Sequence, residues 1–261
     1  MSEGTDNVLL ERFEQEVWSK VPHLEEGSET NVVNATPLVD MTADFKECAK
    51  TVFKLDLDNA DLRVLGKMDS TLLTGSIKVR PAANIIHNAI ISGNLKSGQT
   101  VIEATSGNFG IALGLLSKLG LNVIALVSRK LQEGVFEELR NGNIRTMDLD
   151  MDICPAPGME GKQDLMVAKA TAANIRSQLS NFGFDTDIFD KEISEIESLL
   201  AKQDIINLAK FLAKIYGFFC PAQYDNQLNI EAHRTVTAAE IDQQLHENGD
   251  SLENFNIFCT F

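Results

Sequence analysis

Hydrophobic residues recur along the middle of this chain with two alternating periods, one typical of strands and one typical of helices. Short apolar runs rich in β-branched residues predict strands at 100–104, 121–127 and 144–149. Between them, residues 109–119 and 133–140 carry apolar positions at helical spacing and end at glycine-containing turns. Strands that alternate with single helices at this short spacing predict a parallel sheet with right-handed crossovers, and therefore an α/β domain.

The same reasoning predicts further elements on both sides of this core. Helices are expected at 81–92, 161–179, 185–200, 204–216 and 235–246. Residues 34–57 are expected to form a strand, a polar connection and a second strand at 51–55, and an apolar strand is expected at 255–261. The first 30 residues are acidic with apolar positions at helical spacing, which predicts a short helical extension packed on the domain or on a dimer partner.

The composition narrows the classes of function. The 261 residues are 44% hydrophobic, which is enough for a sizeable core in one large or two modest domains. A net charge of −15 argues against nucleic acid or anionic membrane as a partner, because phosphate groups need basic patches. There is no apolar run for a membrane span or a signal peptide, and the four cysteines are scattered. We therefore expect a cytoplasmic protein with free thiols and no zinc site.

A glycine-rich turn follows the first of the central strands. Gly107 and Gly110 allow a tight turn, and the helix start after it offers free backbone N–H groups to an anion. Thr105, Ser106 and Asn108 add side-chain donors. No lysine follows the glycines and the spacing is not Gly-x-Gly-x-x-Gly, which excludes a P-loop and a dinucleotide fingerprint. The turn is expected to hold a small anion such as a carboxylate, with a plain helix N-cap as the alternative.

The second candidate for chemistry is a lysine at the start of a helix. Lys78 lies between a Gly-Ser turn and a helix opened by Pro81, a residue tolerated in a first helical turn because its N–H is not needed there. A lysine held at such a turn is a nucleophile suited to Schiff-base chemistry. An ordinary exposed lysine is the alternative.

Three short motifs occur in a recognisable order. They are Asn-Ala-Thr-Pro-Leu-Val at 34–39, Ser-Ile-Lys-Val-Arg at 76–80 and Thr-Ser-Gly-Asn at 105–108. A weaker fourth match runs over 221–226 and is followed by Glu-Ala-His at 231–233. Together they resemble the cysteine synthase / cystathionine β-synthase group of the fold-type II pyridoxal phosphate enzymes. Ala35 departs from that pattern, and so does Val79, which stands where aspartate is common.

The resemblance implies a role for each motif residue. Lys78 would form a Schiff base with pyridoxal phosphate and later remove the α-proton of the substrate. Asn108 would hydrogen-bond the phenolic oxygen of the cofactor. Thr105, Ser106 and Gly107, together with Asn108, would bind the α-carboxylate of an amino-acid substrate. Gln223 would reach the same carboxylate from the other domain.

The resemblance also implies a fold. It is the parallel-sheet, three-layer sandwich of the tryptophan synthase β-subunit type, with the second domain incomplete. Residues 59–222 would form the N-terminal α/β domain, 31–58 and 223–261 would form part of the larger cofactor domain, and 1–30 would be the helical extension. The acidic segment 182–201 resembles an insertion with a solvated face. A homodimer is expected.

The implied reaction is β-replacement on an O-activated serine, in which a nucleophile such as sulfide adds to an aminoacrylate. The family's phosphate-binding Gly-Thr-Gly-Gly-Thr loop would follow the strand at 255–261, and the sequence stops there. We therefore expect weak cofactor binding by these 261 residues. The alternative is a catalytically impaired relative that acts as a binding or interaction subunit.

Overall fold

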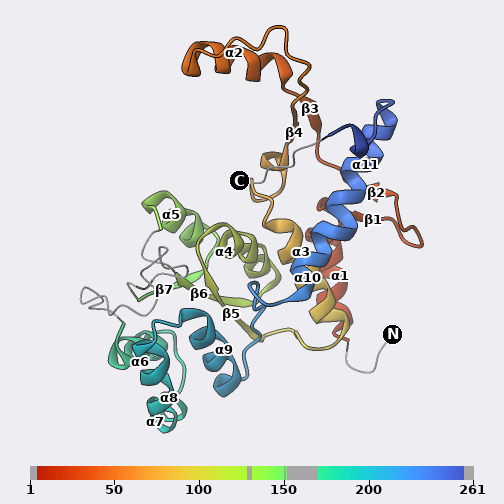
Figure 1. Ribbon diagram of the computed structural model, residues 1–261. Helices are drawn as coiled ribbons and strands as arrows, with labels where there is room; N and C mark the ends of the chain where they lie inside the picture. Colours follow the sequence, from red (N-terminus) through yellow and green to blue (C-terminus); the bar gives the residue numbers. More distant parts are fainter. Residues whose placement is uncertain (1–4, 128–130, 150, 152–169, 256–261) are drawn as a thin grey trace.

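A parallel sheet forms the centre of the molecule. The computed structural model describes residues 5–127, 131–149, 151 and 170–255. The sheet has the strand order β5-β6-β7 and contains β5 (Thr100–Thr105), β6 (Asn122–Val127) and β7 (Arg145–Asp148). Both strand pairs are parallel, with Thr105 opposite Val127 at the carboxyl end of β5 (Figure 1). The three strands predicted from the apolar runs and the α/β class are confirmed.

One face of the sheet packs on helices from the N-terminal half of the chain. Val101, Val123 and Ala125 point to this face and are almost fully buried. The helices that cover it are α1 (Asn7–Glu16), α3 (Val79–Ile91), α4 (Asn108–Leu113), the 3₁₀ helix η3 (Gly114–Leu119) and α5 (Glu133–Asn141). Because side chains alternate along a strand, the neighbouring Ile102 and Ile124 point to the opposite face.

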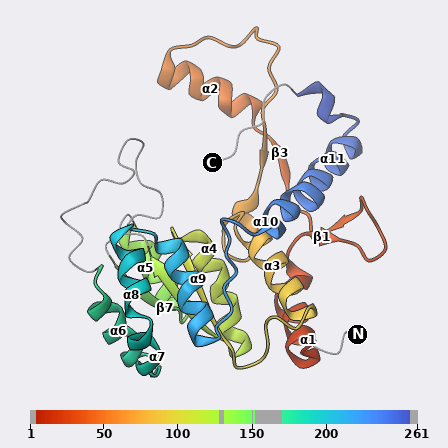
Figure 2. The same cartoon turned by 60° about the horizontal axis from the view of Figure 1, so that its bottom comes forward.

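That opposite face is covered by a group of four helices. They are α6 (Ala172–Asn181), α7 (Asp187–Lys191), α8 (Ile193–Ala201) and α9 (Ile205–Tyr216). Leu208 and Leu212 of α9 are fully buried against the sheet, and Figure 2 shows this group on the side away from α3. Helices on both faces give the three-layer α/β/α arrangement that was predicted. The helix expected at 185–200 is divided into α7 and α8.

The segment after α9 extends the sheet at the free edge of β5. The Phe219 N–H donates to the Thr100 carbonyl at 2.9 Å, and the Ile102 N–H donates to the Phe219 carbonyl at 2.9 Å. Phe219 therefore forms a parallel bridge with Val101. This bridge brings residues 221–223 beside the carboxyl end of β5.

A second group of elements lies beyond α3. Its helices are α10 (Gln227–Glu231), the π-helix η4 (Ala232–Thr237) and α11 (Ala238–Glu247). Its strands form two antiparallel pairs. One pair is β1 (His23–Leu24) with β2 (Val32–Val33), and the other is β3 (Leu38–Asp40) with β4 (Leu65–Lys67). Short 3₁₀ helices are η1 (Trp18–Lys20), η2 (Asp69–Thr71) and η5 (Leu252–Asn254). α10 packs on α3 (Figure 2), and Lys78 at the N-terminal end of α3 lines the cavity described below. The proposed domain boundaries remain predictions.

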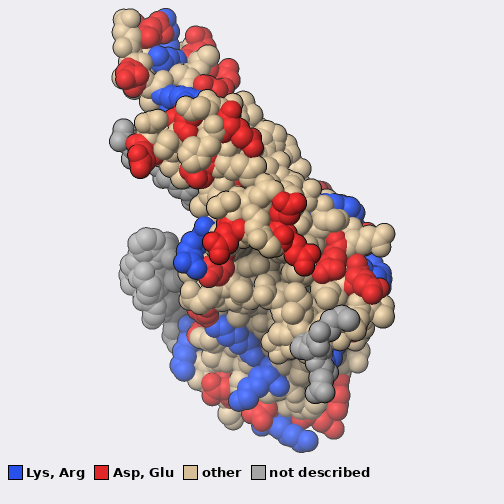
Figure 3. Space-filling view, turned by 90° about the vertical axis from the view of Figure 1, so that its right-hand side faces the viewer, with Lys and Arg blue, Asp and Glu red and all other residues tan. Residues whose placement is uncertain are grey.

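The strand predicted at 51–55 is wrong. Most of that segment belongs to helix α2 (Thr42–Phe53), which ends at Lys54 in the left-handed conformation. The β-branched and aromatic residues that suggested a strand favour β structure only when a neighbouring strand packs against them, and α2 lies far from the sheet (Figure 1). The β3–β4 pair carries α2 as an arm that stands clear of the body, with acidic and basic side chains interspersed on it (Figure 3).

The helices predicted at 81–92, 133–140 and 204–216 are confirmed with small shifts at their ends, and the helix predicted at 235–246 begins in the π-helix η4 and continues as α11. The helix expected at 109–119 is α4 followed by η3, and it ends at Gly120 with φ of 85°. The strand expected at 255–261 lies almost wholly outside the described residues, as does the first half of the helix expected at 161–179. Among the described residues, no helix is both long and apolar enough to cross a membrane.

Candidate active site

A cavity of about 300 Å³ opens at the carboxyl end of β5. Ligands in open parallel sheets bind at this end of the strands. The residues that line it are Lys78, Ser106, Gly107, Asn108, Phe109, Leu131, Gln132, Val135 and Gln223. The fold therefore brings together residues from three distant motifs of the sequence.

Lys78 is held at the start of α3 by its neighbours. Gly75, with φ of 64°, closes a turn in which its N–H donates to the Leu72 carbonyl at 2.8 Å. The Ser76 hydroxyl accepts the Lys78 N–H at 3.2 Å, and Val79 and Arg80 are buried. The backbone of Lys78 is thus fixed, while its side chain is half-buried and reaches the cavity. Its amine has no hydrogen-bond partner among the described residues.

The loop after β5 is organised by Thr105 from within. The Thr105 hydroxyl accepts the N–H groups of Gly107 at 3.1 Å and Gly110 at 3.0 Å. Gly107 has φ of 135°, and a Cβ on it would lie 3.0 Å from a methyl group of Val135. A Cβ on Gly110 would lie 2.7 Å from Thr105. Only glycine fits at these two positions, so the shape of the loop is built in before any ligand binds.

This arrangement decides which groups face the cavity. The backbone N–H groups of Gly107 and Gly110, which were expected to bind an anion, already donate to the Thr105 hydroxyl. Thr105 itself is 1% exposed and is not among the residues that line the cavity. Ser106 and Asn108 are exposed at the cavity, and their side chains have no hydrogen-bond partner within the described chain. The donors that these two residues and Lys78 offer to a ligand are therefore side-chain groups. The role of Thr105 toward a substrate remains a prediction, as do the roles of the others.

Gln223 lies in the wall of the cavity at the edge of β5. Its side-chain Nε2 donates to the Ala104 carbonyl at 3.0 Å, and its backbone N–H donates to Glu103 at 3.1 Å. Its own carbonyl accepts the side-chain amide of Asn229 at 2.8 Å. The structure thus joins Gln223 to the strand that leads into the 105–108 loop, although 115 or more residues of sequence separate them.

Sequence reasoning missed Glu103. This residue is 1% exposed, and burial raises the pKa of its carboxyl group to about 7 against the opposing effect of backbone N–H donors. The available signal was an acidic residue in the middle of an otherwise apolar buried strand.

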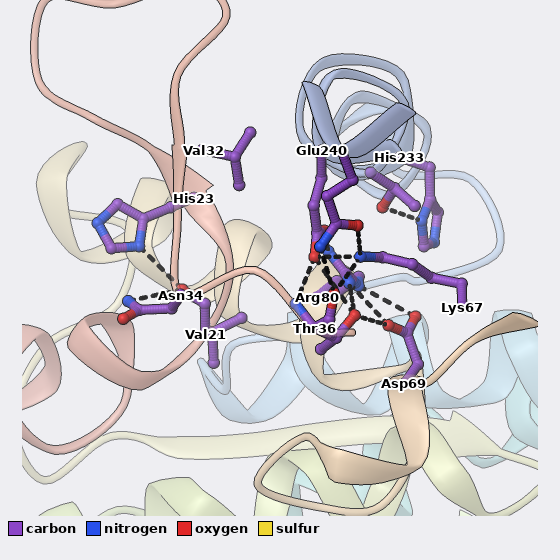
Figure 4. A network of polar contacts seen from close by, with 12 residues as sticks. Val21, His23, Val32, Asn34, Thr36, Lys67, Asp69, Arg80, His233 and Glu240 are labelled. Carbon is purple, nitrogen blue, oxygen red and sulfur yellow. Dashed lines mark hydrogen bonds and ion pairs between the residues drawn. The ribbon is translucent and has the colours of Figure 1, made fainter. Parts of the chain in front are cut away.

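Sequence reasoning also missed a buried charge network behind Lys78. Arg80 donates to Asp69 at 2.7 Å and to Glu240 at 2.5 Å, and Lys67 lies 2.6 Å from the other oxygen of Glu240. The Thr36 hydroxyl donates to Asp69 at 2.9 Å (Figure 4). We call these five residues the charge brace. Its two cations and two carboxylates balance, and it ties the start of α3 to α11 and to the base of the arm.

His233 lies beside the brace on the π-helix η4. Its Nδ1 is 3.1 Å from the Thr237 hydroxyl (Figure 4). Burial lowers the pKa of His233, and the positive charges of Lys78 and Arg80 lower it further. These effects favour the neutral form of the imidazole, and the positive charge of Lys78 contributes to that preference.

Residues 35–255 match the family model described as "Pyridoxal-phosphate dependent enzyme". Because the match spans most of the chain, the chain belongs to this family, whose cofactor is pyridoxal phosphate. The match includes Lys78, the 105–108 loop, Gln223 and the charge brace.

Cysteine synthases are among the curated relatives. The chain is 24% identical over 227 residues to the cysteine synthase of Staphylococcus aureus strain Mu50, covering 87% of this chain and 54% of that protein. A shorter stretch of 56 residues is 43% identical to cysteine synthase B of Pseudomonas aeruginosa, covering 22% of this chain and 19% of that protein. The chain thus spans about half the length of the Staphylococcus relative.

Solved structures overlap with part of the chain. O-ureido-L-serine synthase is 25% identical with a TM-score of 0.47, over 73% of this chain and 45% of that one. A hydrogen sulfide-producing enzyme from Fusobacterium nucleatum is 23% identical with a TM-score of 0.48, over 72% of this chain and 43% of that one. Family membership depends on the match over residues 35–255 and not on these overlaps.

The described residues at the cavity fit part of pyridoxal phosphate. The Lys78 amine is able to react with the aldehyde of the cofactor. The Asn108 side chain is able to donate a hydrogen bond to the phenolic oxygen of the cofactor, and the Ser106 side chain to the carboxylate of a substrate. Thr74, in the turn before Lys78, has a buried hydroxyl without a hydrogen-bond partner in the described chain, but Thr74 is not among the residues that line the cavity. Lys78 is the single cation among the described lining residues, which therefore provide no second positive charge for the phosphate.

Proposed function

We propose that this polypeptide acts in pyridoxal phosphate-dependent β-replacement or β-elimination on an amino acid, with an O-activated serine as the substrate class. The observation that carries the proposal is the shared cavity. It gathers a lysine amine and two side-chain donors that have no hydrogen-bond partner among the described residues, together with a buried glutamine, in a member of this family. The names of the cysteine synthase relatives support the choice of substrate class.

Four residues of the cavity have separate roles in the proposed reaction. When bound, pyridoxal phosphate withdraws electrons from the α-carbon of an attached amino acid. Lys78 would hold the cofactor through its aldehyde, and its Nζ would serve as the base for the α-proton of the substrate. Asn108 would donate to the phenolic oxygen of the cofactor. Ser106 donates to the substrate carboxylate, and Gln223 contributes from the wall at the edge of β5.

A second candidate function is a non-catalytic one. The described lining contains a single cation, so the phosphate of the cofactor has no charged partner there. A chain that binds the cofactor weakly would act as a binding or interaction subunit. We also propose that the chain forms a homodimer.

Equilibrium dialysis of the purified chain against pyridoxal phosphate separates the two candidates. Lys78→Ala is the test variant, and Lys96→Ala, which removes an exposed lysine beyond the end of α3, is the matched control. Binding at one cofactor per chain that is lost only in Lys78→Ala, followed by sulfide-dependent turnover of an O-acylated serine, supports the enzyme. Absence of saturable binding supports the non-catalytic subunit.

A further inference from the structure

A buried carboxyl group lies directly behind the cavity wall. Glu103 is 1% exposed and lies on β5, two residues before the 105–108 loop. One of its oxygens accepts the Ala104 N–H at 3.0 Å, and the other accepts the Gln223 N–H at 3.1 Å. The tasks assigned to the cavity residues do not use this group, so its burial requires a separate explanation.

The backbone opposite Glu103 is strained. Ala222 has φ of 52°, a left-handed conformation that a residue with a Cβ rarely adopts. Its carbonyl accepts the N–H groups of Asp225 at 2.9 Å and Asn226 at 3.0 Å, which closes a turn. The Gln223 N–H, directly after Ala222, donates to the Glu103 carboxyl at 3.1 Å, and the Ala222 N–H opposes the effect of burial on the pKa of that group.

This turn sets the position of Gln223. The backbone N–H of Gln223 is held by Glu103, and its side chain is held by the Ala104 carbonyl at 3.0 Å. Two adjacent residues of β5 therefore fix both parts of a residue that lines the cavity with Lys78. If the turn relaxes, Gln223 moves relative to the lysine.

The charged and titratable groups around Glu103 come from α9 and from the segment after it. Lys210 of α9 is paired with Asp225 and lies close enough to oppose the effect of burial on Glu103. Burial raises the pKa of the Cys220 thiol to about 12, and the nearby Glu103 adds to this effect. Cys220 thus stays neutral, and Lys210 is shared with Asp225, so the main support of the Glu103 carboxyl is backbone N–H groups.

We propose that Glu103 is a positioning residue whose buried carboxyl group holds the left-handed turn at Ala222 and so keeps Gln223 in the cavity wall. The action of Gln223 on a substrate rests on the proposed function. The positioning of Gln223 by Glu103 does not, because it is a property of the chain without cofactor or substrate.

Amide hydrogen exchange of the full chain without ligand tests the positioning. Glu103→Ala should lower the protection of the amides at 222–226 by about tenfold or more, because the buried Gln223 N–H loses its acceptor. Adding Ala222→Gly should restore much of this protection, since glycine adopts the left-handed conformation without strain. Glu231→Ala, which removes an exposed partner of Arg234 on α10, is the control. Unchanged protection at 222–226 in Glu103→Ala overturns the proposal.

A pH titration of the wild-type chain keeps the test decisive if Glu103→Ala fails to fold. The Gln223 amide resonance should shift with a midpoint near 7, the pKa to which burial raises Glu103, and Glu103→Gln should abolish the shift. A Gln223 resonance that does not move between pH 5 and pH 9 overturns the proposal. Failure of Lys78 to bind cofactor leaves these readouts unaffected.

Discussion

The edge of β5 and the base of the arm bury polar groups in opposite ways. At the edge of β5, Glu103 and Thr105 are satisfied mainly by backbone N–H groups, and no cation among the described residues forms an ion pair with Glu103. At the base of the arm, Glu240 is fully buried between Arg80 and Lys67. At the edge of β5, backbone donors fix the local shape, but burial still disfavours the charged form of Glu103. At the base of the arm, the cations that pair with Glu240 join distant elements of the chain. The first region forms the cavity, and the second holds the lysine helix in place.

The largest effect is expected from breaking the charge brace. Glu240→Ala leaves two buried cations without this carboxylate, and removal of one partner of a buried pair costs about 3–5 kcal/mol of unfolding free energy. Urea unfolding measures this loss. Asp190→Ala, which removes the partner of Arg176 in an exposed ion pair, is the control and should change stability little. A loss for Glu240→Ala as small as that of the control would show that the brace does not hold the fold.

The second effect concerns pH and the Glu103 carboxyl group. Burial raises its pKa from the ordinary 4.5 to about 7, so the folded state holds this proton more tightly than the unfolded state. The stabilising contribution is therefore complete below pH 4.5 and is lost as pH rises to about 7. The shift corresponds to about 3 kcal/mol.

Glu103→Gln removes this dependence because the amide does not titrate. The difference in unfolding free energy between wild type and Glu103→Gln, measured at pH 4 and pH 8, should change by about 3 kcal/mol. Taking the difference cancels the other carboxyl groups. A constant difference across this range would mean that Glu103 is not buried as a titrating acid.

The third effect comes from the loop that Thr105 organises. Thr105→Val keeps the shape of the side chain but leaves the N–H groups of Gly107 and Gly110 without their acceptor. Each unsatisfied buried donor costs about 1–3 kcal/mol, so thermal unfolding should show a clear loss of stability. Thr71→Val, which removes an exposed hydroxyl bonded to a single carbonyl, is the matched control. Equal stability of the two variants would show that the loop does not depend on Thr105.

The smallest effect on stability is expected at the exposed cavity side chains. Ser106→Ala should change the unfolding free energy by no more than about 0.5 kcal/mol, because its hydroxyl has no partner in the described chain. In the same variant, affinity for an amino-acid substrate should fall by about 1.5–3 kcal/mol if the hydroxyl binds the carboxylate. Titration calorimetry with the cofactor-loaded chain measures the second quantity. Unchanged affinity would remove Ser106 from the site.

The sequence predicted the parts of this molecule in which local pattern and tertiary context agree. The apolar runs of β5, β6 and β7 have one stable environment, a sheet covered on both faces. Lys78 and the 105–108 loop could be predicted because their turns leave a short, local signature. The strand predicted at 51–55 in the arm was wrong because residues 51–53 have β propensity but no strand lies beside them. The partners of Glu103 and of the charge brace could not be predicted, because they lie 120 and 160 positions away in the chain.

Borohydride trapping with peptide mapping tests the central claim most directly, namely that the cavity presents Lys78 to pyridoxal phosphate. The wild-type chain is incubated with the cofactor, reduced, digested and analysed by mass spectrometry. The expected result is a pyridoxyl group on the peptide that contains Lys78, and its loss in Lys78→Arg without relocation to another lysine. A label on Lys96 or any other lysine, with the Lys78 peptide unmodified, would contradict the account.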